Sequence, residues 1–415
     1  MLTPNILTPE ATSPVRLLHV VGESRYGGAA RIILRLGQIA QAEGWQVDVL
    51  TTDPIFQQAV RQFGLGLVDL DVIRREIRPV WDLRGLARLR RFLLGRPYQI
   101  VHTHTSKAGF VGRLAARLAG VPVIVHTAHG FAFHEASPAA PRIVYSALEQ
   151  IASHWCDRIV TVSEFHRAWA IELGMSKPQR IVAIPNGIAD IARTRQAALG
   201  ELRREMGAEP DDFVILSMAR LAPDKGLEYL IEAASILPHT GRRLQFVIAG
   251  DGPHRGHLER LAATLGVSGR VKFLGFREDV ADLLAASDLI ALPSLREGLS
   301  IALLEAMAAA RPIVATSIGS QREVAAHAEM AILVPPADAL TLSQSILHLV
   351  ADPALRERLA ANARAVYESR YTEARMLHSY RRLYLDLVRA KCAESATQES
   401  PVLVPASHQS EGDSV

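Results

Sequence analysis

Two pairs of charged residues in the second half of the chain have the types and the spacing of a ligand-binding site. Arg220 and Lys225 follow the apolar run 213–219. Glu297 and Glu305 bracket the segment Gly-Leu-Ser-Ile-Ala-Leu-Leu. Each pair follows a predicted strand, and the carboxyl ends of parallel strands meet at one edge of a sheet, so the four side chains should lie close together. Two fixed cations suit a diphosphate, and two carboxylates suit sugar and ribose hydroxyls.

The two cations lie on either side of a predicted strand-to-helix turn. Arg220 ends the strand, and Lys225 with Gly226 opens the next helix. A guanidinium and an ammonium in this arrangement can reach one diphosphate, where they would stabilise the charge of a leaving group. The alternative is a solvated surface pair.

The two carboxylates belong to a loop and to the helix that follows it. Ser300 is a suitable N-cap for a predicted helix over 301–310, and the first amides of that helix favour an anion. Glu305 lies about one and a half turns into the helix, so Glu297 and Glu305 would bind different parts of one ligand. The alternative is a helix-start acid plus a surface glutamate, although Leu303 and Leu304 flank Glu305 closely.

In the first half of the chain, Gly27 and Gly28 link the first predicted strand to its helix. Glycines at this turn let the backbone approach a substrate closely. The spacing from Gly22 to Gly28 does not match the dinucleotide-binding pattern G-x-G-x-x-G. The alternative is a tight strand-to-helix turn with no ligand.

Metal binding is not expected from the histidines or from the one DxD sequence. His102 and His104 alternate on a predicted strand and should point to one face, but no carboxylate or cysteine neighbour completes a metal site. Asp69 and Asp71 end an apolar run with no other sign of a metal. His129 follows a strand end, where a polar side chain facing a cleft is plausible.

The segment 84–96 combines apolar and basic side chains. Its leucines form one stripe, with Arg84, Arg88 and Arg91 on the opposite side. Such a helix can lie on an anionic membrane surface. The alternative, which we favour, is a helix that packs on a sheet and exposes a basic outer face.

Length and composition narrow the class of protein. The chain has 415 residues, enough for two domains, and half of them are apolar. The net charge of +3 is too small for a nucleic-acid-binding protein. No apolar run is long enough to span a bilayer, and the start of the chain lacks the pattern of a signal peptide. Cys156 and Cys392 are expected as separate thiols, which indicates the cytoplasm.

Short β-branched runs alternate with helical patterns in both halves, which predicts an α/β fold with two doubly wound, Rossmann-like domains facing across a cleft. The expected strands are 15–21, 46–50, 67–72, 100–104, 123–126, 158–162 and 181–184 in the first half, and 214–218, 244–249, 271–274, 289–292, 313–315 and 332–334 in the second. The predicted organisation is a flexible leader (1–14), a first Rossmann-like domain (15–190), a second Rossmann-like domain (191–370), a C-terminal helix (371–390) and a disordered tail (391–415).

The order of these motifs over residues 15–390 resembles the retaining glycosyltransferases of family 4, which have the GT-B fold. The resemblance rests on Gly27-Gly28, His102-Thr-His-Thr-Ser-Lys-Ala-Gly, His126-Thr-Ala-His-Gly-Phe, Thr161-Val-Ser-Glu, Ile184-Pro-Asn-Gly, Arg220 with Lys225-Gly226, Gly250-Asp-Gly-Pro and Glu297-x7-Glu305. It implies transfer of a sugar from a nucleoside diphosphate to a saccharide or polyprenyl-linked acceptor, with no cofactor and no metal. It assigns acceptor binding to the first domain (15–190) and nucleotide-sugar binding to the second (191–370), with the C-terminal helix (371–390) packed back on the first domain. It further implies surface polysaccharide biosynthesis in the cytoplasm, at the inner face of the membrane.

The resemblance also implies roles for individual residues. Catalysis is assigned to His129, Glu297, Arg220 and Lys225, and donor binding to Gly28, Arg220, Lys225, Arg277, Glu297, Gly298, Leu299, Ser300 and Glu305. Within these sets the diphosphate is assigned to Arg220 and Lys225, the donor sugar to Glu297, the ribose to Glu305, and the base to the neighbourhood of Arg277.

The chain departs from the family pattern at three places. Ala30 stands where the first helix usually carries a glutamate, Ala310 replaces a common glycine, and Ser300 replaces a common proline or glycine. Two other functions stay open at this point. One is a nucleotide-sugar epimerase on the same plan, and the other is a non-catalytic sugar-nucleotide-binding subunit of a transferase complex.

Overall fold

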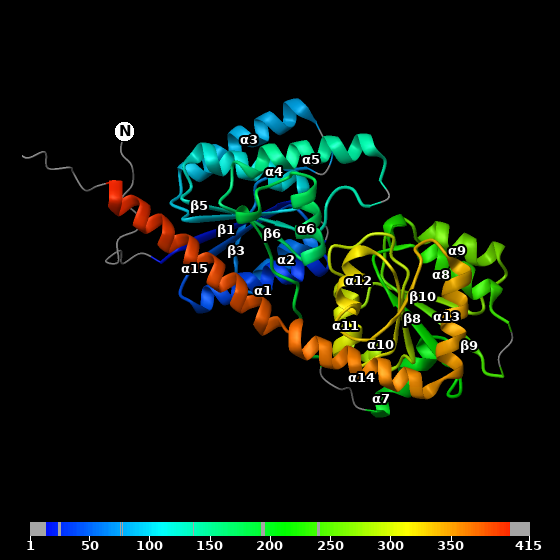
Figure 1. The fold of residues 1–415 in the computed structure, drawn as a ribbon. Helices are drawn as coiled ribbons and strands as arrows, with labels where there is room; N and C mark the ends of the chain where they lie inside the picture. The colour runs from blue at the N-terminus through cyan, green and yellow to red at the C-terminus, as the bar shows by residue number, and fades with distance from the viewer. Residues whose placement is uncertain are drawn as a thin grey trace, which may run out of the picture.

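The chain forms two parallel β-sheets, each covered by helices on both faces (Figure 1). The structure is a computed structural model that describes residues 14–23, 26–74, 76, 78–135, 137–191, 196–238 and 241–398. The predicted leader and most of the predicted tail lie outside these residues. The α/β fold class with two doubly wound domains is confirmed.

The first sheet has seven parallel strands in the order β3-β2-β1-β4-β5-β6-β7. Its strands are β1 (Arg16–Gly22), β2 (Gln46–Thr51), β3 (Gly66–Val68), β4 (Ile100–His104), β5 (Val123–Ala128), β6 (Arg158–Thr161) and β7 (Ile181–Ala183). The strands at the centre are buried on both faces, which explains why they do not show the alternation of apolar and polar residues that a half-exposed strand has. Their buried polar side chains, such as His102 and His104, are hydrogen-bonded.

The second sheet has six parallel strands in the order β10-β9-β8-β11-β12-β13. Its strands are β8 (Phe213–Met218), β9 (Leu244–Ala249), β10 (Val271–Gly275), β11 (Leu289–Leu292), β12 (Ile313–Thr316) and β13 (Ile332–Val334). All the predicted strands are found close to their predicted ends except 67–72. That strand stops at Val68, where the chain turns away from the sheet edge and Leu70 donates to the Val68 carbonyl.

Helices connect the strands of both sheets. Around the first sheet lie α1 (Gly28–Ala42), α2 (Pro54–Gln62), α3 (Pro79–Leu94), α4 (Ser106–Ala119), α5 (Ala139–Ser153), α6 (Glu164–Glu172) and the 3₁₀ turn η1 (Pro178–Arg180). Around the second lie α7 (Gln196–Glu205), η2 (Pro223–Lys225), α8 (Leu227–Ile236), α9 (Arg255–Thr264), α10 (Val280–Ala285), α11 (Ile301–Ala308), α12 (Gly319–Ala325), α13 (Ala339–Ala351) and α14 (Pro353–Arg370). Side-chain caps fix several helix starts, as where Asp53 accepts from the Phe56 amide before α2.

The last helix, α15 (Glu373–Gln398), runs from the second domain to the first, where it packs along α1 (Figure 1). It continues beyond Ala390, where the predicted helix ended. Its Tyr380 and Tyr384 are buried against the first sheet, and Glu373 bonds Arg35 of α1. Near the crossing point Ile188 donates to Tyr371 and accepts from Glu373, so the two chain segments that join the domains run side by side.

None of the described helices combines the length and the apolar character needed to cross a bilayer.

Candidate functional site

The carboxyl ends of both sheets open onto one cavity of about 1510 Å³ between the domains. Residues that follow β4 and β5 line it from one side, and residues that follow β8, β9 and β11 line it from the other. The pairs predicted from the sequence, Arg220 with Lys225 and Glu297 with Glu305, all lie in its wall. The cavity therefore has the position expected of a ligand site in open α/β sheets.

Arg220 and Lys225 lie at the end of β8 and in η2. Lys225 Nζ donates to Glu297 Oε1 at 2.7 Å, and Arg220 lies 3.0 Å from Asp224 Oδ1. The turn requires Gly226, because its φ is +59° and a Cβ there would lie 2.2 Å from the Pro293 carbonyl. The close approach of the η2 turn to the end of β11 thus brings Lys225 to Glu297.

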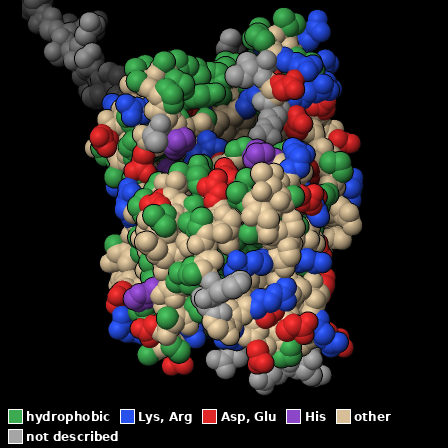
Figure 2. Space-filling model, turned by 90° about the vertical axis from the view of Figure 1, so that its right-hand side faces the viewer, with side chains coloured by type: hydrophobic (Ala, Val, Ile, Leu, Met, Phe, Trp, Pro, Cys, Tyr) green, Lys and Arg blue, Asp and Glu red, His purple; other side chains and the backbone are tan. Residues whose placement is uncertain are grey.

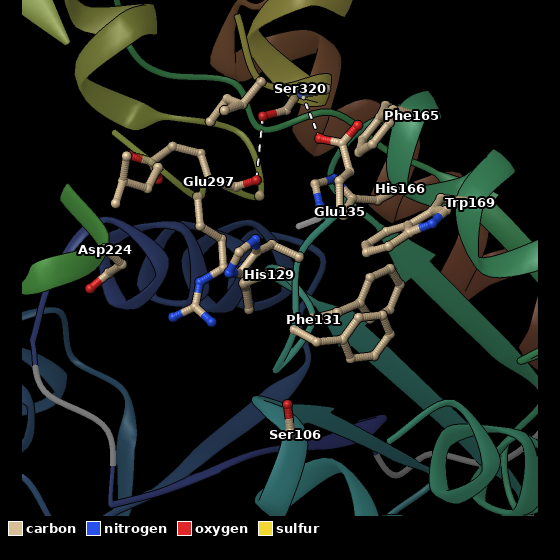
Figure 3. Close-up of a pocket in the computed structure, with 18 of the residues that line it drawn as sticks. Ser106, His129, Phe131, Glu135, Phe165, His166, Trp169, Asp224, Glu297 and Ser320 are labelled. Carbon is tan, nitrogen blue, oxygen red and sulfur yellow. Dashed lines mark hydrogen bonds between the residues drawn. The ribbon is translucent and has the colours of Figure 1, made fainter. Parts of the chain in front are cut away.

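Both the carboxylate and the backbone carbonyl of Glu297 are hydrogen-bonded. Its Oε1 also accepts from Ser294 Oγ at 2.9 Å, and its carbonyl oxygen accepts from Ser320 Oγ at 3.3 Å. Its side chain is only 14% exposed. Figure 3 shows Glu297 and His129, which come from opposite domains, in the wall of one pocket of about 400 Å³. A ligand group placed between them would touch both domains.

The start of α11 supplies the other predicted donor contacts. Ser300 is the N-cap, as predicted, and accepts from the Leu303 amide at 3.3 Å. Gly298, Leu299 and Ser300 all line the large cavity. The first amides of α11 therefore lie next to Lys225 and Glu297, where a helix N-terminus favours an anion.

Glu305 lies in the cavity wall one helical turn deeper and is 7% exposed. Burial raises the pKa of its carboxyl group, and the guanidinium of Arg31 acts in the opposite direction. Arg31 belongs to α1 of the first domain and lies 2.9 Å from Glu305 Oε1. This ion pair connects the two domains across the cleft.

Two glycines allow the domains to come this close. A Cβ on Gly28 would lie 2.7 Å from the Ile301 side chain, and one on Gly298 would lie 1.9 Å from the His129 carbonyl. Gly28 therefore contacts the start of α11, opposite the predicted donor loop. A tight strand-to-helix turn, the alternative considered for Gly27 and Gly28, does not by itself explain the contact between Gly28 and Ile301.

Arg277 also lines the large cavity, as predicted, but it is already paired. Its guanidinium donates to Asp279 at 2.8 Å and contacts Glu205. Both carboxylates raise its pKa further above the usual arginine range. The structure thus places Arg277 in the cavity wall with its guanidinium paired to two carboxylates.

His129 is half-buried and ends a chain of histidines whose other members, His104 and His19, are fully buried. Its Nε2 lies 3.1 Å from His104 Nδ1, and His104 Nε2 lies 3.0 Å from His19 Nδ1. Burial lowers the pKa of His129 to about 4 and that of His19 to about 3, so both rings are neutral at pH 7. Among the described residues His129 Nδ1 has no hydrogen-bond partner. In a chain of neutral rings each ring can donate once and accept once, so His104 determines which nitrogen of His129 carries the proton.

His19, His102 and His104 also offer ring nitrogens that lie within 4.8 Å of one another. Both nitrogens of His102 are used, by Tyr384 and Thr127, and both of His104 are used by its histidine neighbours. This donor set fits a hydrogen-bonded network better than a metal site. Neither Asp69 nor Asp71 of the DxD sequence is among the residues that line the cavity, and Asp71 pairs with Arg74.

Sequence reasoning missed four residues that hold the site together. They are Arg31, Asn186, Asp224 and Ser294. Asn186 donates to the Leu299 carbonyl at 3.3 Å, which ties the interdomain segment to the start of α11. Arg31 follows Gly28 by three residues and so shares its helix face, which was the one signal in the sequence.

Comparisons with known proteins agree with this geometry. A family model described as glycosyl transferases group 1 matches residues 200–366, and one described as glycosyl transferase 4-like domain matches residues 27–187. The chain is 29% identical over 390 residues to the Escherichia coli UDP-Gal:alpha-D-GlcNAc-diphosphoundecaprenol alpha-1,3-galactosyltransferase, covering 91% of this chain and 98% of that protein. It is 31% identical over 310 residues to the alpha-D-kanosaminyltransferase of Streptomyces kanamyceticus, covering 71% and 78%.

Two solved structures are similar in fold. The Anabaena protein Alr3699/HepE in complex with UDP and glucose superposes with a TM-score of 0.76 at 23% identity, over 89% of this chain and 99% of that one. WaaG, a glycosyltransferase of lipopolysaccharide biosynthesis, superposes with a TM-score of 0.71 at 20% identity, over 88% and 98%.

Proposed function

The chain belongs to the group 1, family 4 glycosyltransferases of the GT-B fold, which act in glycan biosynthesis. From this premise we propose that it transfers a sugar from UDP to a saccharide carried on a polyprenyl diphosphate, with retention of the anomeric configuration and without a metal ion. The observation that carries the proposal is the meeting of Lys225, Glu297 and the start of α11 in the interdomain cavity. The names of the Escherichia coli relative and the Anabaena complex support UDP, and the former supports the lipid carrier.

In this proposal Arg220, Lys225 and the amides of α11 bind the diphosphate of the donor. Lys225 is paired with Glu297 in the structure, so donor binding redirects its ammonium group toward phosphate. The two cations and the helix terminus then stabilise the charge that grows on the leaving diphosphate, which is the role of a divalent ion in other transferases.

Glu297 binds hydroxyls of the donor sugar, Glu305 binds the ribose, and His129 contacts the sugar from the opposite domain. Retention is proposed from the family resemblance, and the carboxylates of the smaller pocket favour a same-face displacement over a covalent sugar–enzyme intermediate. Glu135, Asp224 and Glu297 are each ion-paired, to Arg322, Arg220 and Lys225, which makes each a poor covalent nucleophile. The bond from the sugar carbon to the diphosphate breaks, the acceptor oxygen bonds to that carbon from the same face, and the acceptor proton moves to the leaving phosphate.

A two-stage experiment tests this function. Calorimetric titration with UDP, GDP and ADP should show the tightest binding for UDP. Incubation with UDP-sugars and a panel of acceptors, followed by mass spectrometry and by NMR of the product, should show transfer with an unchanged anomeric configuration. Release of an altered donor sugar without an acceptor would indicate an epimerase, and binding without turnover would indicate a non-catalytic subunit.

The same assay run with excess EDTA tests the metal-free mechanism. Activity should persist, because the cations of the site take the role of the ion. Complete loss that Mg²⁺ or Mn²⁺ restores would contradict this part of the proposal.

A further inference from the structure

Helix α5 exposes an apolar stripe to solvent. Ile143, Val144, Leu148 and Ile151 are 66%, 56%, 39% and 51% exposed, and their spacing places them on one helix face. Glu149 points to the opposite side, where it pairs with Arg113 of α4 at 2.8 Å. The helix is thus anchored by its charged residue, and its outer face is left apolar. An apolar face of this kind marks a binding surface.

Helix α3 adds apolar side chains on the other side of α4. Val80 and Leu83 are 65% and 67% exposed. Figure 2 shows hydrophobic side chains gathered at the upper end of the molecule, which is where α3 and α5 lie in Figure 1, with Lys and Arg side chains beside them. The predicted basic face of α3 is present there, because Arg84, Arg88 and Arg91 are exposed.

A groove runs between α3 and α5 with α4 as its floor. Its floor consists of Phe110, Val111 and Leu114, and its walls of Leu83 and Leu86 on α3 and of Tyr145 and Leu148 on α5. These residues line the same cavity as Lys225 and Glu297. The groove is therefore continuous with the proposed reaction site and opens at the apolar surface of α5.

We infer that this groove binds the isoprenoid chain of a polyprenyl diphosphate-linked acceptor. The inference rests on the proposed function and adds the site for the lipid portion of the acceptor. The lipid portion of an acceptor whose hydroxyl reacts beside Glu297 must leave the cleft, and the groove between α3 and α5 offers mainly apolar side chains. The charged residues that also line it are neutralised in ion pairs, Lys107 with Asp82 and Glu149 with Arg113. The exposed arginines of α3 suit the anionic head groups of the membrane that holds such a lipid.

Binding of a lipid-linked acceptor is not a general property of the family. One relative of this chain is a 2-deoxystreptamine glucosyltransferase, and the acceptor in that name has no lipid portion.

Photo-crosslinking with a benzophenone analogue of farnesyl diphosphate tests the inference on the full chain. The wild-type protein should be labelled on peptides from α3, α4 and α5, and unlabelled undecaprenyl phosphate should compete. The double variant Leu83→Glu/Leu148→Glu should lose at least about tenfold in labelling, because two apolar contacts become charged. The matched control Ile236→Glu/Leu340→Glu changes two exposed apolar residues of the second domain, 49% and 60% exposed, and should be labelled as the wild type is.

Three results would overturn the inference. The first is that the wild-type protein is not labelled, or that Leu83→Glu/Leu148→Glu and Ile236→Glu/Leu340→Glu are labelled to the same extent. The second is loss of binding to phosphatidylcholine–phosphatidylglycerol vesicles in Leu83→Glu/Leu148→Glu with probe labelling unchanged, which would make the surface a membrane contact only. The third is a change from dimer to monomer in that variant by light scattering. UDP affinity is measured in parallel. If the wild-type protein binds UDP but is not labelled by the probe, the assignment of the groove is wrong and the transferase assignment stands. If the protein does not bind UDP, the transferase assignment itself is in error.

Discussion

Glu297 and Glu305 come from one loop and helix but have different partners, and this difference predicts different defects. Glu305, assigned to the ribose, should matter for UDP and donor alike, so Glu305→Gln should weaken both by about 1.5–3 kcal/mol. Glu297→Gln should keep UDP affinity, because the amide can still accept from Lys225 and Ser294. Its turnover should fall about 10²-fold, since contacts near the reacting carbon act mainly in the transition state.

Titration calorimetry with UDP, paired with initial rates on one donor, checks this pair of variants. A swap of the two patterns would exchange the roles of the carboxylates. Wild-type behaviour in both variants would make the pair structural.

The histidine chain gives a second prediction at this scale. His104→Phe removes the hydrogen bond that orients His129, so kcat should fall while UDP affinity is retained. His102→Phe is the matched control, because His102 is equally buried on the same strand but bonds Tyr384 and Thr127 and not His129. Both variants should lose stability through an unsatisfied buried partner, by about 1–3 kcal/mol.

Steady-state kinetics and urea unfolding of the two variants separate these effects. Equal losses of kcat in both would mean that the histidines act only through the stability of the sheet. Nitrogen-15 NMR of the histidine rings adds a direct readout, since the His129 tautomer should change only in His104→Phe.

At the scale of elements, closure of the cleft depends on how near the loop before α11 comes to the end of β5. Gly298→Ala should push these elements apart, because the new Cβ would lie 1.9 Å from the His129 carbonyl oxygen. Activity should fall at least about tenfold, because misplacement of reacting groups by about 1 Å can cost 10²-fold. Gly269→Ala is the control, since a Cβ at Gly269 meets nothing within 4 Å.

Rates and thermal melting of the two variants check this prediction. The variant Gly298→Ala should fold, because the clash lies between domains and not within a core. Normal activity in Gly298→Ala would show that the domains need not approach as closely as in the structure.

The sequence predicted elements wherever local pattern and packing agree. Buried parallel strands such as β9 and β11 were placed correctly, because burial of both faces leaves short runs that consist mainly of apolar residues. Capping residues and glycines in the sequence marked the strand-to-helix turns, and these turns correctly predicted that Lys225, Glu297 and Glu305 line one cleft. The contacts between domains were not predictable, because Arg31 reaches Glu305 only after both domains have folded and met.

The exposed stripe of α5 could not be predicted from its periodicity either. An amphipathic pattern fixes which residues share a face, but it does not say whether that face is covered. Here the orientation of α5 depends on its packing against α4, where Arg113 pairs with Glu149, and such contacts between helices are absent from the periodicity of one of them.

At the scale of the whole molecule, α15 makes the two domains depend on each other. Its Tyr384 bonds His102 at 2.6 Å in the core of the first domain, while the segment before it packs on the second. The first domain thus encloses a network of polar side chains that Tyr380 and Tyr384 of α15 complete. The stability of this network has a definite pH dependence.

Burial lowers the pKa of His102, His104 and His126 well below 6.5, and that of His166 to about 4. The unfolded chain, with ordinary histidine pKa values near 6.5, binds more protons than the folded chain at any pH between about 4 and 6.5. The free energy of unfolding must therefore fall as the pH drops through 6.5. Each of these histidines contributes a slope that approaches about 1.4 kcal/mol per pH unit below that value.

Urea unfolding at pH 7.0, 6.0 and 5.0 measures this slope. Carboxylates whose pKa is lowered, such as Asp190 and Asp279, lose their contribution only near and below pH 3.8 and do not enter this window. Glu305 has a raised pKa, so its protonation opposes the effect as the pH falls. His102→Phe should reduce the slope by about one proton, close to 1.4 kcal/mol per pH unit, because it removes one buried group that the unfolded chain protonates. Equal stability of the wild type at pH 7.0 and 5.0 would mean that the histidines are hydrated and can take up protons in the folded protein.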